Sequence, residues 1–124
     1  MTLESWKEEF YPQYPIESMT KMQAIKHSII KWTGLRKENL SRHDLQVDNE
    51  GDIKYKGDYF FIDGGSCALC VKYFSKIHPS CENCPLYKLL GNSCDAPTVS
   101  SPFNIWQDRE DPEPMIAALQ KLLE

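Results

Sequence analysis

The sequence predicts an α+β fold: a small single domain with N-terminal helices, a β-hairpin, a treble-clef-like zinc knuckle region and a C-terminal helix. Three observations support this prediction. Apolar residues recur with helical spacing near both ends of the 124-residue chain. Residues 52–62 are rich in aromatic and β-branched side chains around a Lys56-Gly57-Asp58 turn, which indicates a hairpin. Two CxxC pairs follow between residues 67 and 84.

The expected domain spans residues 1–124 and has three parts. Residues 1–45 are the helical part, 46–94 the hairpin plus the cysteine cluster, and 95–124 a loop and the C-terminal helix. A chain of this length can bury one modest core. No stretch of about 18 apolar residues is present, so we expect no transmembrane helix. The N-terminal residues lack the apolar run of a signal peptide, so we expect a cytoplasmic location.

The first ten residues predict a short amphipathic helix. Leu3, Trp6 and Phe10 fall on one side of it, and it must end before Pro12, because the residue preceding a proline is pushed out of the helical region. A further short helical or irregular piece is expected within residues 35–45.

The main helix is expected to begin at Ser18 or Thr20 and to end at Gly34, a residue type common at the C′ position. Gln23, three residues after Thr20, can complete a capping box. The expected buried face consists of apolar residues at steps of three and four, namely Met22, Ile25, Ile29 and Trp32. The charged and histidine positions fall away from that face, so we expect Lys26, His27 and Lys31 to be solvated.

The hairpin is expected to carry different side chains on its two faces. One face combines the residues Ile53, Tyr55, Tyr59 and Phe61. Phe60 and Ile62 lie on the other face, so we expect the second strand to be covered on both sides. The strand then leads into the first CxxC pair.

The cysteine pattern is the strongest chemical signal. Cys67, Cys70, Cys81 and Cys84 supply four thiolates, which is the ligand set of a closed tetrahedral Zn²⁺ site. Either Cys94 or His78 can substitute for one of them. Four thiolates also suit an iron–sulfur cluster, which stays as the alternative cofactor. Because a closed site has no open coordination position, the expected role of the metal is to stabilise the fold.

The segment Cys84-Pro85-Leu86 predicts the start of a helix. Proline is favoured at the first helical position, which makes Cys84 the N-cap of a helix ending near Gly91. The helix dipole favours a thiolate at that position and lowers its pKa.

Residues 95–113 are expected to form a loop, because Pro97, Pro102 and Pro112 interrupt them. This loop contains the apolar group Phe103, Ile105 and Trp106. The last helix should begin at Pro112 or Pro114. Its apolar stripe, expected to join the core or a dimer seam, consists of Met115, Ile116, Leu119, Leu122 and Leu123.

The net charge of −4 is unevenly distributed. Residues 21–43 are basic and residues 95–114 are acidic, so the two segments either serve a partner or face each other, and the second interpretation is favoured. If the basic segment binds phosphates, Tyr55, Tyr59 or Trp106 can stack on bases. The candidate ligand- or partner-binding residues are Lys26, Lys31, Arg36, Lys37, Arg42, Trp106 and Arg109.

The run CALC–KYF–C–NCPLY–G–SC, after a helix of the form AIKHSIIKWTGLRKENL, resembles a group of small cysteine-rich phage and prophage accessory proteins. The matching positions are His27 to Leu35 and then Cys67, Cys70, Cys81, Cys84, Pro85, Leu86, Tyr87 and Cys94. The resemblance implies a bacteriophage protein that acts in the cytoplasm of a bacterial host. Small proteins of this kind often block host machinery or a defence system, which implies counter-defence.

The leading functional hypothesis is therefore a zinc-stabilised binding protein that binds or inhibits a host or defence protein. The residues mark no nucleophile–base pair, so catalysis is disfavoured. The alternatives are a nucleic-acid or nucleotide-sequestering protein that uses residues 21–43 and, less favoured, a thiol or redox enzyme in which Cys94 works with His78 or His43. A monomer and a dimer both fit the sequence.

Overall fold

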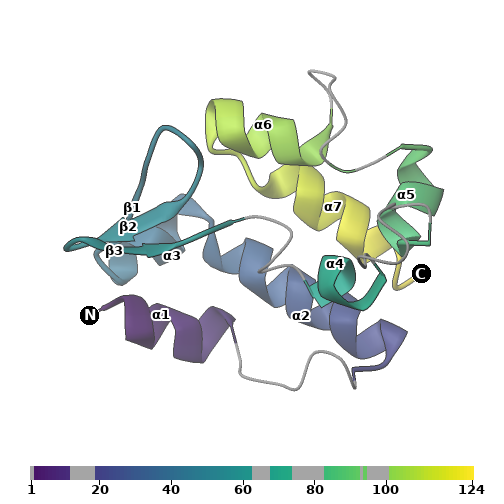
Figure 1. Cartoon of the computed structure of the whole chain (residues 1–124), viewed down its shortest axis with the longest axis horizontal. Helices are drawn as coiled ribbons and strands as arrows, with labels where there is room; N and C mark the ends of the chain where they lie inside the picture. The colour runs from purple at the N-terminus through teal and green to yellow at the C-terminus, as the bar shows by residue number, and fades with distance from the viewer. Residues whose placement is uncertain (1, 12–18, 63–67, 74–82, 93, 95–100) are drawn as a thin grey trace.

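The computed structural model describes residues 2–11, 19–62, 68–73, 83–92, 94 and 101–124, and the side chain of Cys70 lies outside the described part. The described residues form a mixed helical structure with one small antiparallel sheet (Figure 1). In chain order the elements are α1 (Leu3–Phe10), α2 (Lys21–Gly34), α3 (Lys37–Arg42), β1 (Gln46–Val47), β2 (Ile53–Tyr55), β3 (Asp58–Phe60), α4 (Ala68–Tyr73), α5 (Pro85–Leu90), α6 (Pro102–Arg109) and α7 (Glu113–Lys121).

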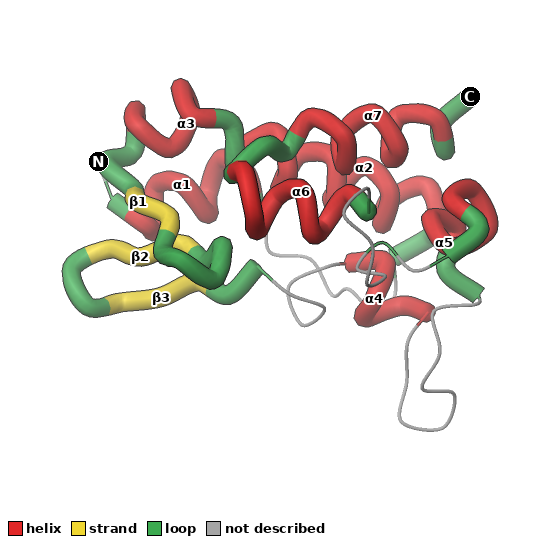
Figure 2. The backbone as a smooth tube through the Cα atoms, turned by 90° about the horizontal axis from the view of Figure 1, so that it is seen from above, coloured by secondary structure: helices red, strands yellow, loops and turns green. Residues whose placement is uncertain are grey.

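The long helix α2 is the centre of the fold. It packs against α1, α4 and α7, and Figure 1 shows it running through the molecule between α1 and α7. The sheet and α3 lie at one end, and α5 lies with the C-terminus at the other end (Figures 1 and 2). Side chains from all these regions join one hydrophobic core, which includes Trp6, Ile25, Ile53, Trp106 and Leu119.

This central position corrects the predicted faces of α2. The prediction that His27 and Lys31 are solvated is wrong, because both side chains are buried. Met22 was expected in the core and is 46% exposed, whereas Ile25 and Trp32 are buried as expected. A helix packed by neighbours on several sides buries more than one face, so a single apolar stripe under-predicts its burial. The amine of Lys31 lies 5.2 Å from the centre of the Trp32 ring.

The helix starts follow the local capping signals. The predicted capping box of α2 is confirmed, because Thr20 Oγ1 accepts from the Gln23 amide at 3.1 Å and the Gln23 side chain accepts from the Thr20 amide at 2.9 Å. A second box, which the sequence reading missed, joins Thr2 and Ser5 at the start of α1. The predicted first helix and its buried side are confirmed, with Phe10 as the last helical residue.

Gly34 has a different role from the predicted one. The helix includes Gly34, and Leu35 is the C-cap with an ordinary right-handed backbone. A Cβ at Gly34 would lie 2.4 Å from Cγ of Phe10, so only glycine allows α1 to approach this closely. The indole N–H of Trp6 donates to the Gly34 carbonyl at 2.9 Å, which fixes the same contact.

The sheet has the order β1-β2-β3, and β1 was not predicted. The predicted hairpin is confirmed, but its turn consists of the two residues Lys56 and Gly57, which both have positive φ. In this register Ile53 pairs with Phe60 and Lys54 pairs with Tyr59. Directly paired residues share a face of the sheet. Tyr59 therefore lies on the opposite face from Ile53, contrary to the prediction.

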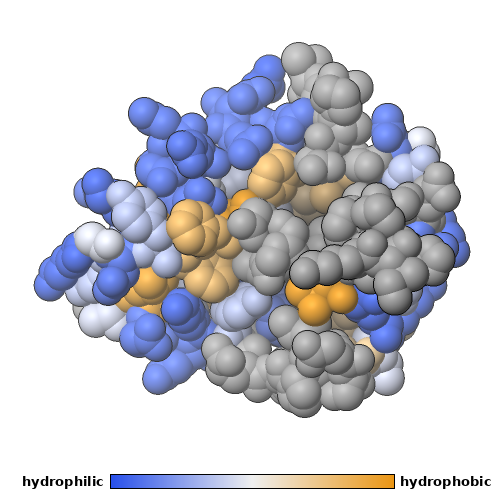
Figure 3. All heavy atoms as spheres, viewed as in Figure 1, coloured by the Kyte–Doolittle hydropathy of each residue, from blue (hydrophilic) through white to orange (hydrophobic). Residues whose placement is uncertain are grey.

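The second strand is also not covered on both sides. Phe60 packs inward, with its ring 5.5 Å from that of Trp6, and Ile62 is buried. Tyr59 is 47% exposed and Phe61 is 58% exposed. In Figure 3, hydrophobic residues (orange) lie at the surface near the sheet, next to hydrophilic residues (blue).

The prediction of a loop over residues 95–113 is wrong for its second half. Residues 102–109 form helix α6, with Pro102 at the first helical position, where its missing N–H is not needed. Trp106 is fully buried and packs edge-on against Trp32 at 5.8 Å. Pro112 is the N-cap of α7, so the predicted start of the last helix at Pro112 is confirmed, and Pro102 also starts a helix. The apolar stripe of α7 enters the core at Met115, Ile116 and Leu119.

Only parts of the two CxxC regions lie within the described residues. The predicted helix after Cys84 is confirmed: α5 starts at Pro85, and Gly91 ends it with a φ of 76°. The first pair, in contrast, runs into helix α4, which includes Cys70. The described residues thus show an α+β fold but do not show a zinc knuckle.

Candidate functional site

The predicted metal ligands are only partly within the described residues. Cys84 is the buried N-cap of α5, and Cys94 is half-buried beside the core. Cys67, Cys81 and His78 lie outside the described residues, as does the Cys70 side chain. Within the described part no three His, Cys, Asp or Glu side chains form a group that could hold a metal ion.

One electrostatic interaction links Cys84 to helix α4. Burial raises the pKa of the Tyr73 hydroxyl, and the nearby charge of the Cys84 thiolate raises it further. Tyr73 is the last residue of α4, so Cys84 lies near the C-terminal end of that helix.

A polar cluster joins α1 to α3 and was not predicted. Ser5 Oγ lies 2.8 Å from Nδ1 of His43, and Nε2 of His43 lies 3.5 Å from the Glu9 carboxylate. Arg42 donates to Glu9 at 2.6 Å. This hydrogen bond is the main reason why the pKa of Glu9 is below its ordinary value. The sequence contains no local signal for the cluster, since 38 residues separate Ser5 from His43.

The cluster contains a serine, a histidine and a glutamate, which are the residue types of a hydrolase triad. Their hydrogen bonds, however, serve to connect helices. The Ser5 hydroxyl donates to the Thr2 carbonyl at 2.8 Å and accepts from the Thr2 amide at 2.9 Å, so it already caps α1. The Glu9 carboxylate pairs with Arg42, which opposes its use to polarise His43. A nucleophile needs a hydroxyl that is available to its base and to a substrate. The geometry therefore supports a connection between helices rather than catalysis.

The predicted basic residues do not gather into one basic surface. Lys31 and Trp106 are in the interior. Arg36 forms a two-fold contact with Glu113, at 2.9 Å for each hydrogen bond, so the basic and acidic segments face each other at this point. Lys26 is exposed on α2. Arg42 is paired with Glu9.

Arg36 borders a shallow surface pocket of mixed charge. Lys37 and Arg109 also line it, together with four acidic side chains, Glu38, Glu110, Asp111 and Glu113. The acidic residues offset the positive charge that a polyanion would need. Three of the predicted basic positions thus meet at one place, but they do not make it a basic site.

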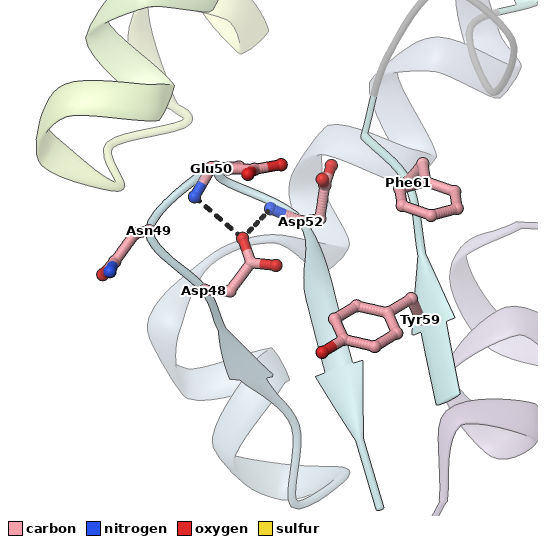
Figure 4. Close-up of a pocket in the computed structure, with 6 residues that line it drawn as sticks. All are labelled: Asp48, Asn49, Glu50, Asp52, Tyr59 and Phe61. Atoms are coloured by element: carbon pink, nitrogen blue, oxygen red, sulfur yellow. Dashed lines mark hydrogen bonds between the residues drawn. The ribbon is translucent and has the colours of Figure 1, made fainter. Parts of the chain in front are cut away.

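A second pocket, of about 420 Å³, combines carboxylates with exposed aromatic rings (Figure 4). It is lined by Asp48, Asn49, Glu50, Asp52, Tyr59 and Phe61, which we call the acidic–aromatic pocket. The rings of Tyr59 and Phe61 are stacked, with centres 6.3 Å apart and planes 8° from parallel. The sequence predicted a turn over residues 48–52 and placed Tyr59 on the same face of the hairpin as Ile53. The correct register would have revealed the pocket.

These features define a small α+β protein with a cysteine-bearing end and an acidic–aromatic pocket at the sheet. No protein-family model, curated protein or solved structure matched the chain. None of the described helices has both the length and the apolar character that crossing a bilayer requires.

Proposed function

We propose that the protein is a zinc-stabilised binding protein that acts by contacting another protein and performs no catalysis. The observation that carries this proposal is the exposed, stacked pair Tyr59 and Phe61 on an ordered sheet. Aromatic side chains are enriched at protein interfaces, where they provide a large contact area at a low cost in conformational entropy. The resemblance to phage accessory proteins makes a host or defence protein the proposed partner class.

The binding role is tested by capture from bacterial lysate with matched variants. The double variant Tyr59→Ser/Phe61→Ser removes the aromatic pair. The control Met22→Ser/Ile30→Ser removes two exposed apolar side chains from α2, which are 46% and 39% exposed. We expect one protein to be captured by the wild type and by the control but not by the Tyr59/Phe61 variant. Capture of nothing specific, or equal capture by all three proteins, contradicts the proposal.

The proposed metal is Zn²⁺ held by Cys67, Cys70, Cys81 and Cys84, with Cys94 or His78 as the substitute ligand. The ligand types and their spacing support it. Elemental analysis of protein purified without chelators should find one zinc ion per chain, and Cys84→Ser should lose it. Iron supports the cluster alternative, and the absence of any metal contradicts a metal-stabilised fold.

A further inference from the structure

We infer that the acidic–aromatic pocket binds an arginine-containing basic segment of a partner protein. This inference rests on the proposed binding function and specifies the chemistry of the partner. Four properties of the pocket support it: its carboxylates form no ion pair with any described residue, its aromatic rings are exposed, its turn is held by hydrogen bonds, and its charge is mostly negative.

The carboxylates of the pocket are available to a cation. Asp48 Oδ1 accepts from the amides of Glu50 and Asp52, and Asp52 Oδ1 accepts from the Ile62 amide at 2.8 Å. No other side-chain hydrogen bond or ion pair engages the carboxylates of Asp48, Glu50 or Asp52 within the described part of the chain. Asp52 is only 8% exposed yet lines the pocket, so a cation there would meet a partly desolvated negative charge.

The aromatic pair favours a guanidinium among the available cations. Tyr59 and Phe61 present nearly parallel exposed rings beside the carboxylates (Figure 4). A guanidinium can stack on an aromatic face while it donates to a carboxylate, whereas an ammonium is a compact and strongly hydrated charge. The same rings could stack on a nucleobase, but three neighbouring carboxylates repel its phosphates. The charge therefore selects a basic peptide over a nucleic acid.

The turn that carries the carboxylates is held in place from α6. The buried indole of Trp106 donates to the Gly51 carbonyl at 2.9 Å, and the Gln107 amide donates to the Glu50 carbonyl at 3.2 Å. Gly51 has a φ of 83°, and a Cβ there would lie 3.0 Å from the indole nitrogen of Trp106. A fixed turn lowers the conformational entropy that binding would otherwise cost.

Lys54 places positive charge near the pocket. Lys54 pairs with Tyr59 and so shares its face of the sheet, but it lines a neighbouring pocket together with Lys56. A basic segment would avoid Lys54 and lie along the turn. Lys54→Gln should therefore strengthen the binding of a basic peptide, whereas removing a carboxylate or an aromatic ring should weaken it.

The test measures the binding of blocked hexaarginine, blocked hexalysine and a short oligothymidylate to the full chain, by titration calorimetry at low and at physiological salt. Hexaarginine should bind more tightly than hexalysine, and oligothymidylate should not bind. Glu50→Gln and Tyr59→Leu should each lower the affinity for hexaarginine by roughly two- to five-fold, and Lys54→Gln should raise that affinity. Glu110→Gln, which removes an exposed carboxylate from a different pocket, should leave the affinity unchanged.

Equal hexaarginine affinity for wild type, Glu50→Gln and Tyr59→Leu overturns the inference, as does tighter binding of oligothymidylate than of hexaarginine. Circular dichroism of each variant confirms that it is folded. The two proposals fail separately. If lysate capture depends on Tyr59 and Phe61 but not on Glu50, the binding function stands and the arginine inference fails. If hexaarginine binds through Glu50 but the lysate yields no partner, the arginine inference stands and the proposed binding function fails.

Discussion

At the scale of single residues, the contact between Gly34 and Phe10 determines how closely α1 packs against α2. The α-carbon of Gly34 faces the Phe10 ring, and a Cβ there would lie 2.4 Å from Cγ of that ring. Gly34→Ala should therefore destabilise the protein by about 1–3 kcal/mol, even though alanine is the better helix former by about 1 kcal/mol. Urea unfolding measures the change. In a Phe10→Gly background the clashing atoms, which include the Cβ of Phe10, are all removed, so the same substitution should become neutral or stabilising. An equal cost in both backgrounds would show that the close approach of α1 is not the cause.

The Glu9–Arg42 pair allows a test of charge at the same scale. Arg42 holds the pKa of Glu9 below its ordinary value of 4.5, chiefly through a hydrogen bond. A lowered folded-state pKa means that the pair stabilises the fold above pH 4.5 and that this contribution disappears as the pH falls through the lowered pKa. Because the pair is exposed, the effect on stability is small. Arg42→Gln should raise the pKa of Glu9 toward 4.5, as measured by NMR titration of its carboxyl carbon. An unchanged titration curve would contradict the contact.

At the scale of elements, helix α6 forms within a segment where Pro97, Pro102 and Pro112 had indicated a loop. Its Trp106 supports the acidic turn through the bond to Gly51. Trp106→Phe removes the donor and leaves a buried carbonyl without its partner, which should cost about 1–3 kcal/mol in unfolding free energy. Gln107→Ala removes an exposed bond to the same turn and should cost less than about 0.5 kcal/mol. Urea unfolding compares the two variants. Similar costs for both would show that the buried bond is unimportant.

The elements that could be predicted are those fixed by local signals. The Thr20–Gln23 capping box and the Cys84-Pro85 helix start act within one turn of helix, and the Leu3–Trp6–Phe10 stripe lies within about two turns, so the sequence alone indicates them. The hairpin was predicted for the same reason. Its register was not, because a two-residue and a three-residue turn place Tyr59 on opposite faces of the sheet.

The features that could not be predicted depend on neighbours distant in the chain. His27 and Lys31 are buried because α2 has neighbours on several sides, and nothing near them in the sequence shows this. The acidic–aromatic pocket requires a turn, a strand and α6 to meet. The Ser5–His43 contact likewise spans two helices. The cysteine spacing predicts a metal site from ligand chemistry alone, and that site stays a prediction.

At the scale of the whole molecule, the sheet and helix α5 lie at opposite ends of α2 (Figure 2). The sheet contributes Tyr59 to the acidic–aromatic pocket, and Cys84, a proposed zinc ligand, is the N-cap of α5. Removing the proposed zinc with a chelator should therefore loosen α5 first, because metal binding contributes folding free energy at its ligands. Hydrogen exchange should show faster exchange of the α5 amides, with the Ile62 amide, which is bonded to Asp52, still protected.

Hexaarginine binding gives a second readout for this experiment. If the pocket is independent of the metal, its affinity for hexaarginine should be the same before and after chelation, since α6 and the sheet hold the turn without any cysteine. Unchanged exchange everywhere would contradict a metal at α5. Loss of protection at Ile62 together with α5 would mean that the metal stabilises the whole domain. The pocket could then form only in the metal-bound protein, because α2 connects its two ends.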